Sequence, residues 1–191
     1  MTKRTLGTGL CACLFLAVPS LASTVPTGVW QQFSFTESGT PAQGCAPADP
    51  AGLFCIPSFG TPTEFAPAPP WNFAARAGAL LSVTDSGEAG DRFEVFDFGI
   101  SLGLTSLPVG NTDCGSDPEV CRITAGISTA QFLLGSGGHS ISITPVSSPS
   151  GGGTGFFLVT DAGAAVPEPS TWALVAAALS ATVTLARRRK R

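Results

Sequence analysis

Eight of the sixteen prolines in this 191-residue chain lie within residues 41–70. Proline lacks a backbone N–H and fixes φ at about −65°, so it disrupts helix interiors and is excluded from central strands. We therefore expect residues 41–70 to form a long surface loop. Cys45 and Cys55 lie within this segment, where a disulfide between them would pin it.

Short runs with a period of two surround the proline-rich segment. In the clearest run, over residues 140–144, isoleucine alternates with serine or threonine, which is typical of a strand with one buried and one exposed face. The glycines at 151–153 then allow a reversal, so we predict that 138–144 and 155–160 form a hairpin. The predicted strands are 29–35, 79–84, 92–98, 100–105, 120–124, 138–144 and 155–160.

Seven or eight short strands with no convincing helix between them favour one fold class. We predict an all-β, antiparallel β-sandwich for residues 23–165. That length is enough for one domain with its own core.

The N-terminal residues have the pattern of an export signal. Lys3 and Arg4 precede an apolar run over residues 10–18, and small residues follow at Ser20 and Ala22. This order predicts a signal peptide over residues 1–22 that signal peptidase removes.

A second hydrophobic stretch lies near the other end. Residues 171–186 carry no charge, proline or glycine. As a helix they would span about 24 Å, against about 30 Å for the hydrocarbon core of a bilayer. We predict a short transmembrane helix whose basic end stays on the cytoplasmic side; a buried core helix is the alternative. The basic residues are Arg187, Arg188, Arg189, Lys190 and Arg191.

A short proline-flanked motif precedes this stretch, formed by Val166, Pro167, Glu168, Pro169 and Ser170. Together with the Thr-Trp-Ala-Leu that follows and the final arginine run, it resembles the PEP-CTERM sorting domain of bacterial surface and exopolysaccharide-associated proteins. The resemblance covers about 26 residues, 166–191. It implies recognition by an exosortase, a membrane cysteine peptidase, and transient residence in the inner membrane. The family often has glycine in the span where this chain has alanine and serine.

A further resemblance concerns the body of the chain. Residues 89–106 and 135–144 are similar to a β-sandwich ectodomain often found ahead of PEP-CTERM tails. Those domains commonly have Asp-Asn-Gly at the first turn, where this chain has Asp97, Phe98 and Gly99. Asparagine adopts positive φ more readily than phenylalanine, which leaves the turn type open.

The predicted ectodomain is strongly acidic. Residues 23–165 contain twelve acidic side chains against three arginines and no lysine, a formal charge of −9, whereas the whole chain has −3. Binding to nucleic acid or anionic lipid requires clustered Lys and Arg, so we expect neither partner. The charge fits solubility outside the cell or cation-bridged contact with an acidic matrix.

Four cysteines lie in the predicted ectodomain: Cys45, Cys55, Cys114 and Cys121. An even number in an exported domain is typical of disulfides, and four cysteines permit three connectivities. We favour Cys45–Cys55 and Cys114–Cys121 because each pair lies within one loop region. A zinc site of four thiolates is the alternative, but neither pair has the C-x2-4-C spacing that such sites commonly use.

Catalytic candidates are few. His139 is the sole histidine, and no nucleophile elbow accompanies it, so we expect a strand-end hydrogen bond there. Asp91 and Asp97 would lie roughly 20 Å apart on one strand at ~3.3 Å per residue, too far for a glycosidase pair at about 5 to 10 Å.

Three acids gather in and beside the second cysteine pair: Asp113, Asp117 and Glu119. Carboxylate oxygens suit Ca²⁺, so calcium binding is one possibility. The spacing does not match the EF-hand pattern, and we expect solvated loop acids, with no resident metal or cofactor.

These observations favour an exported, non-enzymatic surface or matrix protein, associated with exopolysaccharide or biofilm. Its processing partners would be signal peptidase and an exosortase. Trp30 or Trp71 could stack on sugars, but we expect each to pack inside the protein. The alternatives are a carbohydrate-binding module and a secreted hydrolase that assembles its site from scattered acids and His139.

Overall fold

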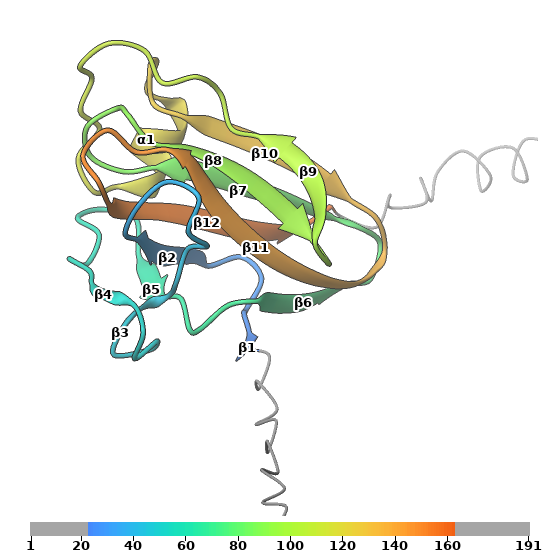
Figure 1. Ribbon diagram of the computed structural model, residues 1–191. Helices are drawn as coiled ribbons and strands as arrows, with labels where there is room; N and C mark the ends of the chain where they lie inside the picture. The colour runs from blue at the N-terminus through green and yellow to red at the C-terminus, as the bar shows by residue number, and fades with distance from the viewer. Residues whose placement is uncertain (1–22, 163–191) are drawn as a thin grey trace, which may run out of the picture.

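The computed structural model describes residues 23–162, which form two five-stranded sheets, one two-stranded sheet and one short helix (Figure 1). Sheet A has the order β1 (Ser23–Thr24), β6 (Trp71–Ala75), β11 (Gly137–Ser147), β8 (Arg92–Asp97) and β9 (Ile100–Leu104). Sheet B has the order β10 (Thr129–Leu134), β7 (Ala79–Asp85), β12 (Gly153–Asp161), β2 (Trp30–Phe35) and β5 (Thr63–Phe65). The remaining elements are β3 (Cys45–Ala46), β4 (Leu53–Phe54) and α1 (Pro118–Ile123).

Most strand pairs are antiparallel, but three are parallel: β1 with β6, β2 with β5, and β3 with β4. The predicted all-β class is therefore confirmed, whereas the prediction of a purely antiparallel sandwich is wrong. The parallel partners β1 and β5 are short strands at the sheet edges. A long stretch of chain connects β1 to β6, and another connects β2 to β5. Parallel pairing requires a long connection of this kind.

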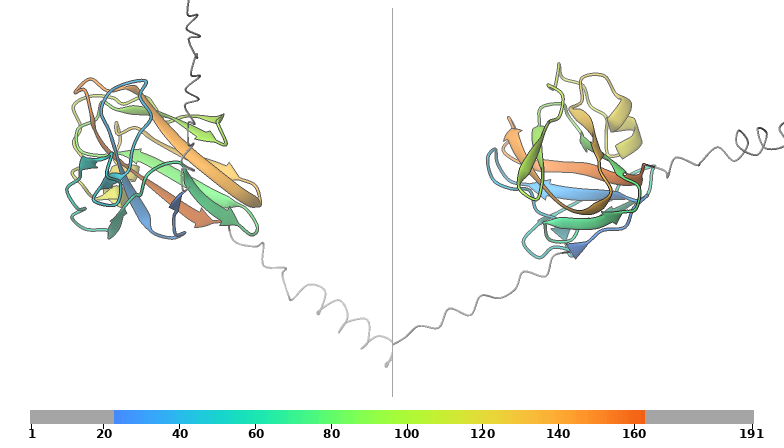
Figure 2. Two further views of the ribbon diagram at one scale, coloured as in Figure 1. Left: turned by 60° about the horizontal axis from the view of Figure 1, so that its bottom comes forward. Right: turned by 90° about the vertical axis from the view of Figure 1, so that its right-hand side faces the viewer.

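The core lies between sheets A and B and is rich in aromatic rings. Phe33 of β2 packs edge-on against Phe93 of β8 at a centroid distance of 5.4 Å, and Trp71 of β6 lies 4.7 Å from Phe157 of β12. These side chains come from both sheets and are almost completely buried. The apolar residues of the alternating runs therefore point into the space between the two sheets. Figure 2 shows the two sheets as separate layers.

The predicted hairpin between 138–144 and 155–160 is wrong. β11 pairs with β6 and β8 in sheet A, whereas β12 pairs with β7 and β2 in sheet B. The ribbons of the two strands cross in Figure 1. Consecutive residues Phe156 and Phe157 point to opposite faces of sheet B and are both fully buried, so β12 is covered on both faces.

The predicted strand over residues 120–124 is also wrong, because residues 120–123 belong to α1 and Thr124 is its C-cap. Asp117 caps the helix: its side chain accepts a 3.0 Å hydrogen bond from the amide of Glu119. Pro118 follows at the first helical position, and Arg122 pairs with Glu119 one turn later at 2.7 Å. Cap, proline and ion pair together outweigh a short alternating pattern.

The proline-rich segment covers the outer face of β2. The hydroxyl of Ser34 donates to the carbonyl of Gly44 at 2.6 Å, and the amide of Ala66 donates to the carbonyl of Gln32 at 2.9 Å. Every residue of β2 is consequently buried. The segment is not wholly a loop, since it contains β3, β4 and the edge strand β5, but it holds no central strand, as its prolines require.

Four predicted segments lie wholly or almost wholly outside the described residues: the signal peptide 1–22, the motif 166–170, the transmembrane helix 171–186 and the basic residues 187–191. Within residues 23–162, no helix has the length and apolar character needed to cross a membrane.

Candidate functional site

The structure contains both predicted disulfides. Cys45 is bonded to Cys55 and Cys114 to Cys121, with Cα–Cα distances of 5.6 and 4.9 Å. The local connectivity is therefore confirmed. With all four thiols paired, none is left as a thiolate ligand for zinc.

The two disulfides lie beside one groove of about 470 Å³ at one end of the sandwich. One wall comes from the proline-rich segment and consists of Phe54, Ile56 and Phe59. The other wall comes from the loop before α1 and consists of Asp113, Gly115 and Ser116. We call this feature the disulfide-flanked groove; β3, β4 and α1 lie at this end of the molecule (Figures 1 and 2).

The floor of the groove is polar. It is formed by Gln32 of β2, Thr154 of β12, and Ser86 and Gly87 after β7. The hydroxyl of Ser86 donates to the carbonyl of Thr154 at 2.8 Å. Gln32 is only 2% exposed, and within residues 23–162 its Oε1 has no hydrogen-bond partner. An unpaired buried acceptor of this kind is uncommon in folded proteins.

Hydrogen bonds join the parts of the groove. The amide of Phe59 donates to Oγ of Ser116 at 3.3 Å. Behind the groove, the amide of Thr61 donates to Oδ2 of Asp117 at 3.0 Å. Gly87 exchanges backbone hydrogen bonds with the second cysteine loop, to the carbonyl of Gly115 at 2.8 Å and from the amide of Cys114 at 3.0 Å. Hydrogen bonds thus link the two walls, and a disulfide lies within each wall segment.

The apolar side chains of the groove face solvent. Phe54 is 82% exposed, Phe59 79% and Ile56 64%. Single exposed apolar residues are common on protein surfaces, but a cluster beside a groove is typical of a binding surface. These residues were not predicted from the sequence, because a proline-rich pattern does not reveal which side chains of a loop are exposed.

His139 forms the strand-end hydrogen bond that the sequence analysis expected. Its Nδ1 lies 2.7 Å from Oδ2 of Asp97, and its Nε2 lies 3.1 Å from the carbonyl of Gly135. The ring is mostly buried and packs on Phe73 at a centroid distance of 5.1 Å. Both ring nitrogens are therefore occupied by oxygen partners, so neither is free for a substrate proton.

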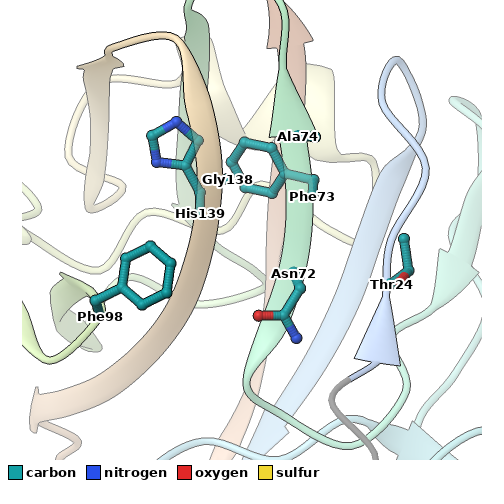
Figure 3. Close-up of a pocket in the computed structure, with 7 residues that line it drawn as sticks. All are labelled: Thr24, Asn72, Phe73, Ala74, Phe98, Gly138 and His139. Carbon is teal, nitrogen blue, oxygen red and sulfur yellow. The ribbon is translucent and has the colours of Figure 1, made fainter.

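A shallow depression of about 370 Å³ lies beside His139. Figure 3 shows Asn72 between Phe98 and Thr24 in this depression. Phe98 is 68% exposed and has φ of 48°, and Gly99 has φ of 77°. Two positive values define a type I′ turn between β8 and β9, which settles the turn type.

Two buried carboxyl groups lie behind the disulfide-flanked groove. Asp85 is fully buried; its Oδ1 accepts from the amide of Ser86 at 2.8 Å and its Oδ2 from the amide of Asp91 at 3.2 Å. Burial, followed by the charge of Asp91, raises the pKa of Asp85 from 3.8 to about 8. Burial also raises the pKa of Asp91, whose Oδ1 has no partner within residues 23–162. Neither carboxyl is among the residues that line the groove in the described part of the chain.

The three calcium candidates are engaged separately. Asp113 accepts from the amide of Gly115 at 2.7 Å, and Asp117 caps α1. Glu119 binds Arg122 and accepts from Nε1 of Trp30 at 3.0 Å; the Arg122 hydrogen bond lowers the pKa of this carboxyl. In residues 23–162, no set of three or more His, Cys, Asp or Glu side chains is arranged around a metal position.

Trp30 and Trp71 pack inside the protein, as expected, and do not form sugar platforms. Trp30 is 3% exposed and Trp71 is fully buried in the core. Neither indole face is available for stacking on an external ligand.

Comparison with known proteins gives one match. Residues 165–190 match the family model of the PEP-CTERM protein-sorting motif. No curated protein and no solved structure matches the chain. The motif implies exosortase processing of an exported protein whose precursor is membrane-anchored. The chain therefore carries a PEP-CTERM sorting motif over residues 165–190.

Proposed function

We propose that this chain is a non-enzymatic protein of the cell surface or extracellular matrix, associated with exopolysaccharide. The observation that carries the proposal is the sorting motif over residues 165–190. This motif resembles the one found in bacterial proteins that are delivered to the cell surface and extracellular matrix. The working part is the disulfide-bonded sandwich, and the segment behind it serves delivery.

Two features of the sandwich support a binding role. The disulfide-flanked groove presents exposed aromatic side chains beside polar groups, which is the usual composition of a ligand site. The groups that could serve acid–base chemistry are already occupied or buried: His139 contacts Asp97 and Gly135, and Asp85 is enclosed.

The test uses the exported protein recovered from the producing cells, incubated with exopolysaccharide from the same cells. Retention on the polysaccharide without new reducing ends is the expected result. New reducing ends would establish the alternative, a secreted hydrolase of matrix polysaccharide. No retention at all would refute the association with exopolysaccharide.

Mass spectrometry of the same protein tests the processing. We expect a C-terminus within or close to residues 166–170 and an N-terminus near residue 23. A protein that still contains Arg191 would refute removal of the sorting segment.

A further inference from the structure

We propose that the disulfide-flanked groove is a saccharide-binding site that takes uncharged sugar units. This inference rests on the proposed association with exopolysaccharide and names the residues that would carry it. The groove fits this role better than the depression beside His139 because it combines several exposed apolar side chains with a buried acceptor that has no partner in the described part of the chain.

The apolar wall has the surface that a sugar ring needs. Phe54 and Phe59 leave most of their ring surface in water, which costs free energy relative to contact with an apolar group. A pyranose presents a flat face of C–H groups, and this face stacks on an aromatic ring. The rings are five residues apart in one disulfide-pinned segment, so successive sugar units of one chain could use both.

The polar floor separates a sugar from a purely apolar ligand. Oε1 of Gln32 is buried and has no hydrogen-bond partner among residues 23–162, and leaving a buried acceptor unpaired costs free energy. Gln32 lines the groove, so a rotation of its side chain would bring this acceptor within reach of a sugar hydroxyl, which is a donor. The hydroxyls of Ser116 and Thr154 lie on the same groove and both donate and accept. An alkyl chain would leave Gln32 unsatisfied.

The walls are also held in place before a ligand arrives. Each wall adjoins a disulfide, and the amide of Phe59 bonds Ser116 across the groove. A ligand therefore meets a largely ordered surface, and less entropy is lost on binding.

The charge of the site selects against acidic sugars. Among residues 23–162, Asp113 is the one charged side chain that lines the groove, and the surrounding domain has twelve acids against three arginines. A uronic acid would meet like charge without a cationic partner. Uncharged units of the polysaccharide are the fitting ligand.

The test compares two variants of the full chain, made in the producing cells and recovered after export. The groove variant carries Phe54→Ala and Phe59→Ala. The matched control is Phe98→Ala, which removes another largely exposed ring, at the far end of β8 from the loop that follows β7. Because these rings are exposed, both variants should melt close to the unaltered protein, and a melt confirms this. The probe is the isolated exopolysaccharide of these cells.

We expect the groove variant to bind the exopolysaccharide at least about tenfold more weakly, because it loses two aromatic side chains that anchor the ligand. The control variant should bind as the unaltered protein does. A Gln32→Met variant should also weaken binding. If the groove variant binds normally while the unaltered protein binds, the groove assignment is overturned and the proposed function stands. If Phe98→Ala alone loses binding, the depression beside His139 is the site. If the unaltered protein does not bind, both proposals fail.

Chemical reduction of the carboxyl groups of the exopolysaccharide tests the preference for uncharged units. Binding should be equal or stronger after reduction. A loss of binding after reduction would overturn the assignment of uncharged sugars.

Discussion

The backbone amide of Asp91 donates a hydrogen bond of 3.2 Å to Oδ2 of Asp85, so two buried carboxyl groups lie next to each other at one end of the sandwich. The nearby arginine, Arg92, is directed away from them, to the carbonyl of Thr105 at 2.9 Å. Negative charges on both Asp85 and Asp91 would repel each other, and Arg92 would not compensate them. A proton bound to one of the two carboxyl groups removes this repulsion.

The first prediction concerns pH. Because the pKa of Asp85 is about 8 in the folded protein against 3.8 ordinarily, the folded state keeps a proton that the unfolded state loses. This contribution to stability is complete below pH 3.8 and is lost as the pH rises toward 8. The free energy of unfolding should fall by up to about 1.4 kcal/mol per pH unit in that window.

Urea unfolding of Asp85→Asn at pH 5 and pH 8 checks this, since the variant should show a flatter pH dependence. The control is Glu88→Gln, which removes an exposed charge from the same loop. An unchanged slope in Asp85→Asn would assign the pH dependence to other groups.

The second prediction concerns the Cys45–Cys55 disulfide. It closes a loop of ten residues, for which loss of the crosslink costs about 2–3 kcal/mol. A variant with both cysteines changed to serine should unfold at lower denaturant concentration and lose groove binding, because the wall with Phe54 and Phe59 is no longer pinned. Equal stability with and without reductant in the unaltered protein would contradict this role.

The third prediction concerns Phe98, whose φ of 48° is unfavourable for a side chain with a Cβ. Asparagine followed by Gly99 is the preferred pair for a type I′ turn. Phe98→Asn should therefore raise the free energy of unfolding by about 1 kcal/mol, measured by thermal or urea unfolding. Ile100→Asn, at a neighbouring exposed position in β9, should give no such gain. A similar gain there would show that replacing an exposed apolar side chain, and not relieving backbone strain, stabilises the protein.

The fourth prediction concerns the pair of His139 and Asp97. His139→Phe keeps a ring against Phe73 but leaves Oδ2 of Asp97 without its 2.7 Å partner. The loss should be about 1–3 kcal/mol of stability with saccharide binding retained. A double-mutant cycle with Asp97→Asn measures the coupling. Loss of binding without loss of stability would instead assign a ligand role to His139.

Much of the fold was predictable because alternation is a local property. The run over residues 140–144 identifies a strand with one inward face, and the structure places Ile141 and Ile143 in the core. The partner of a strand is not local. Phe156 and Phe157 mark a strand buried on both faces, but the glycines before them suggested a hairpin, and only the packing of both sheets decides otherwise.

The start of α1 could have been read from the sequence. Asp117 followed by Pro118 is a helix-start signal, which the alternating pattern of Val120, Arg122 and Thr124 concealed. The candidate site was less accessible. Its cysteine pairs follow from spacing, but the exposure of Phe54 and Phe59 and the burial of Asp85 arise from how distant segments cover one another.

The central place of β12 in sheet B has a consequence for secretion. β12 lies between β7 and β2, so sheet B cannot assemble until residues 153–161 are outside the export channel. Those residues come shortly before the sorting motif at 165–190. Folding of the domain is therefore necessarily a late event, dominated by contacts between distant parts of the chain, and it follows translocation of almost the whole ectodomain.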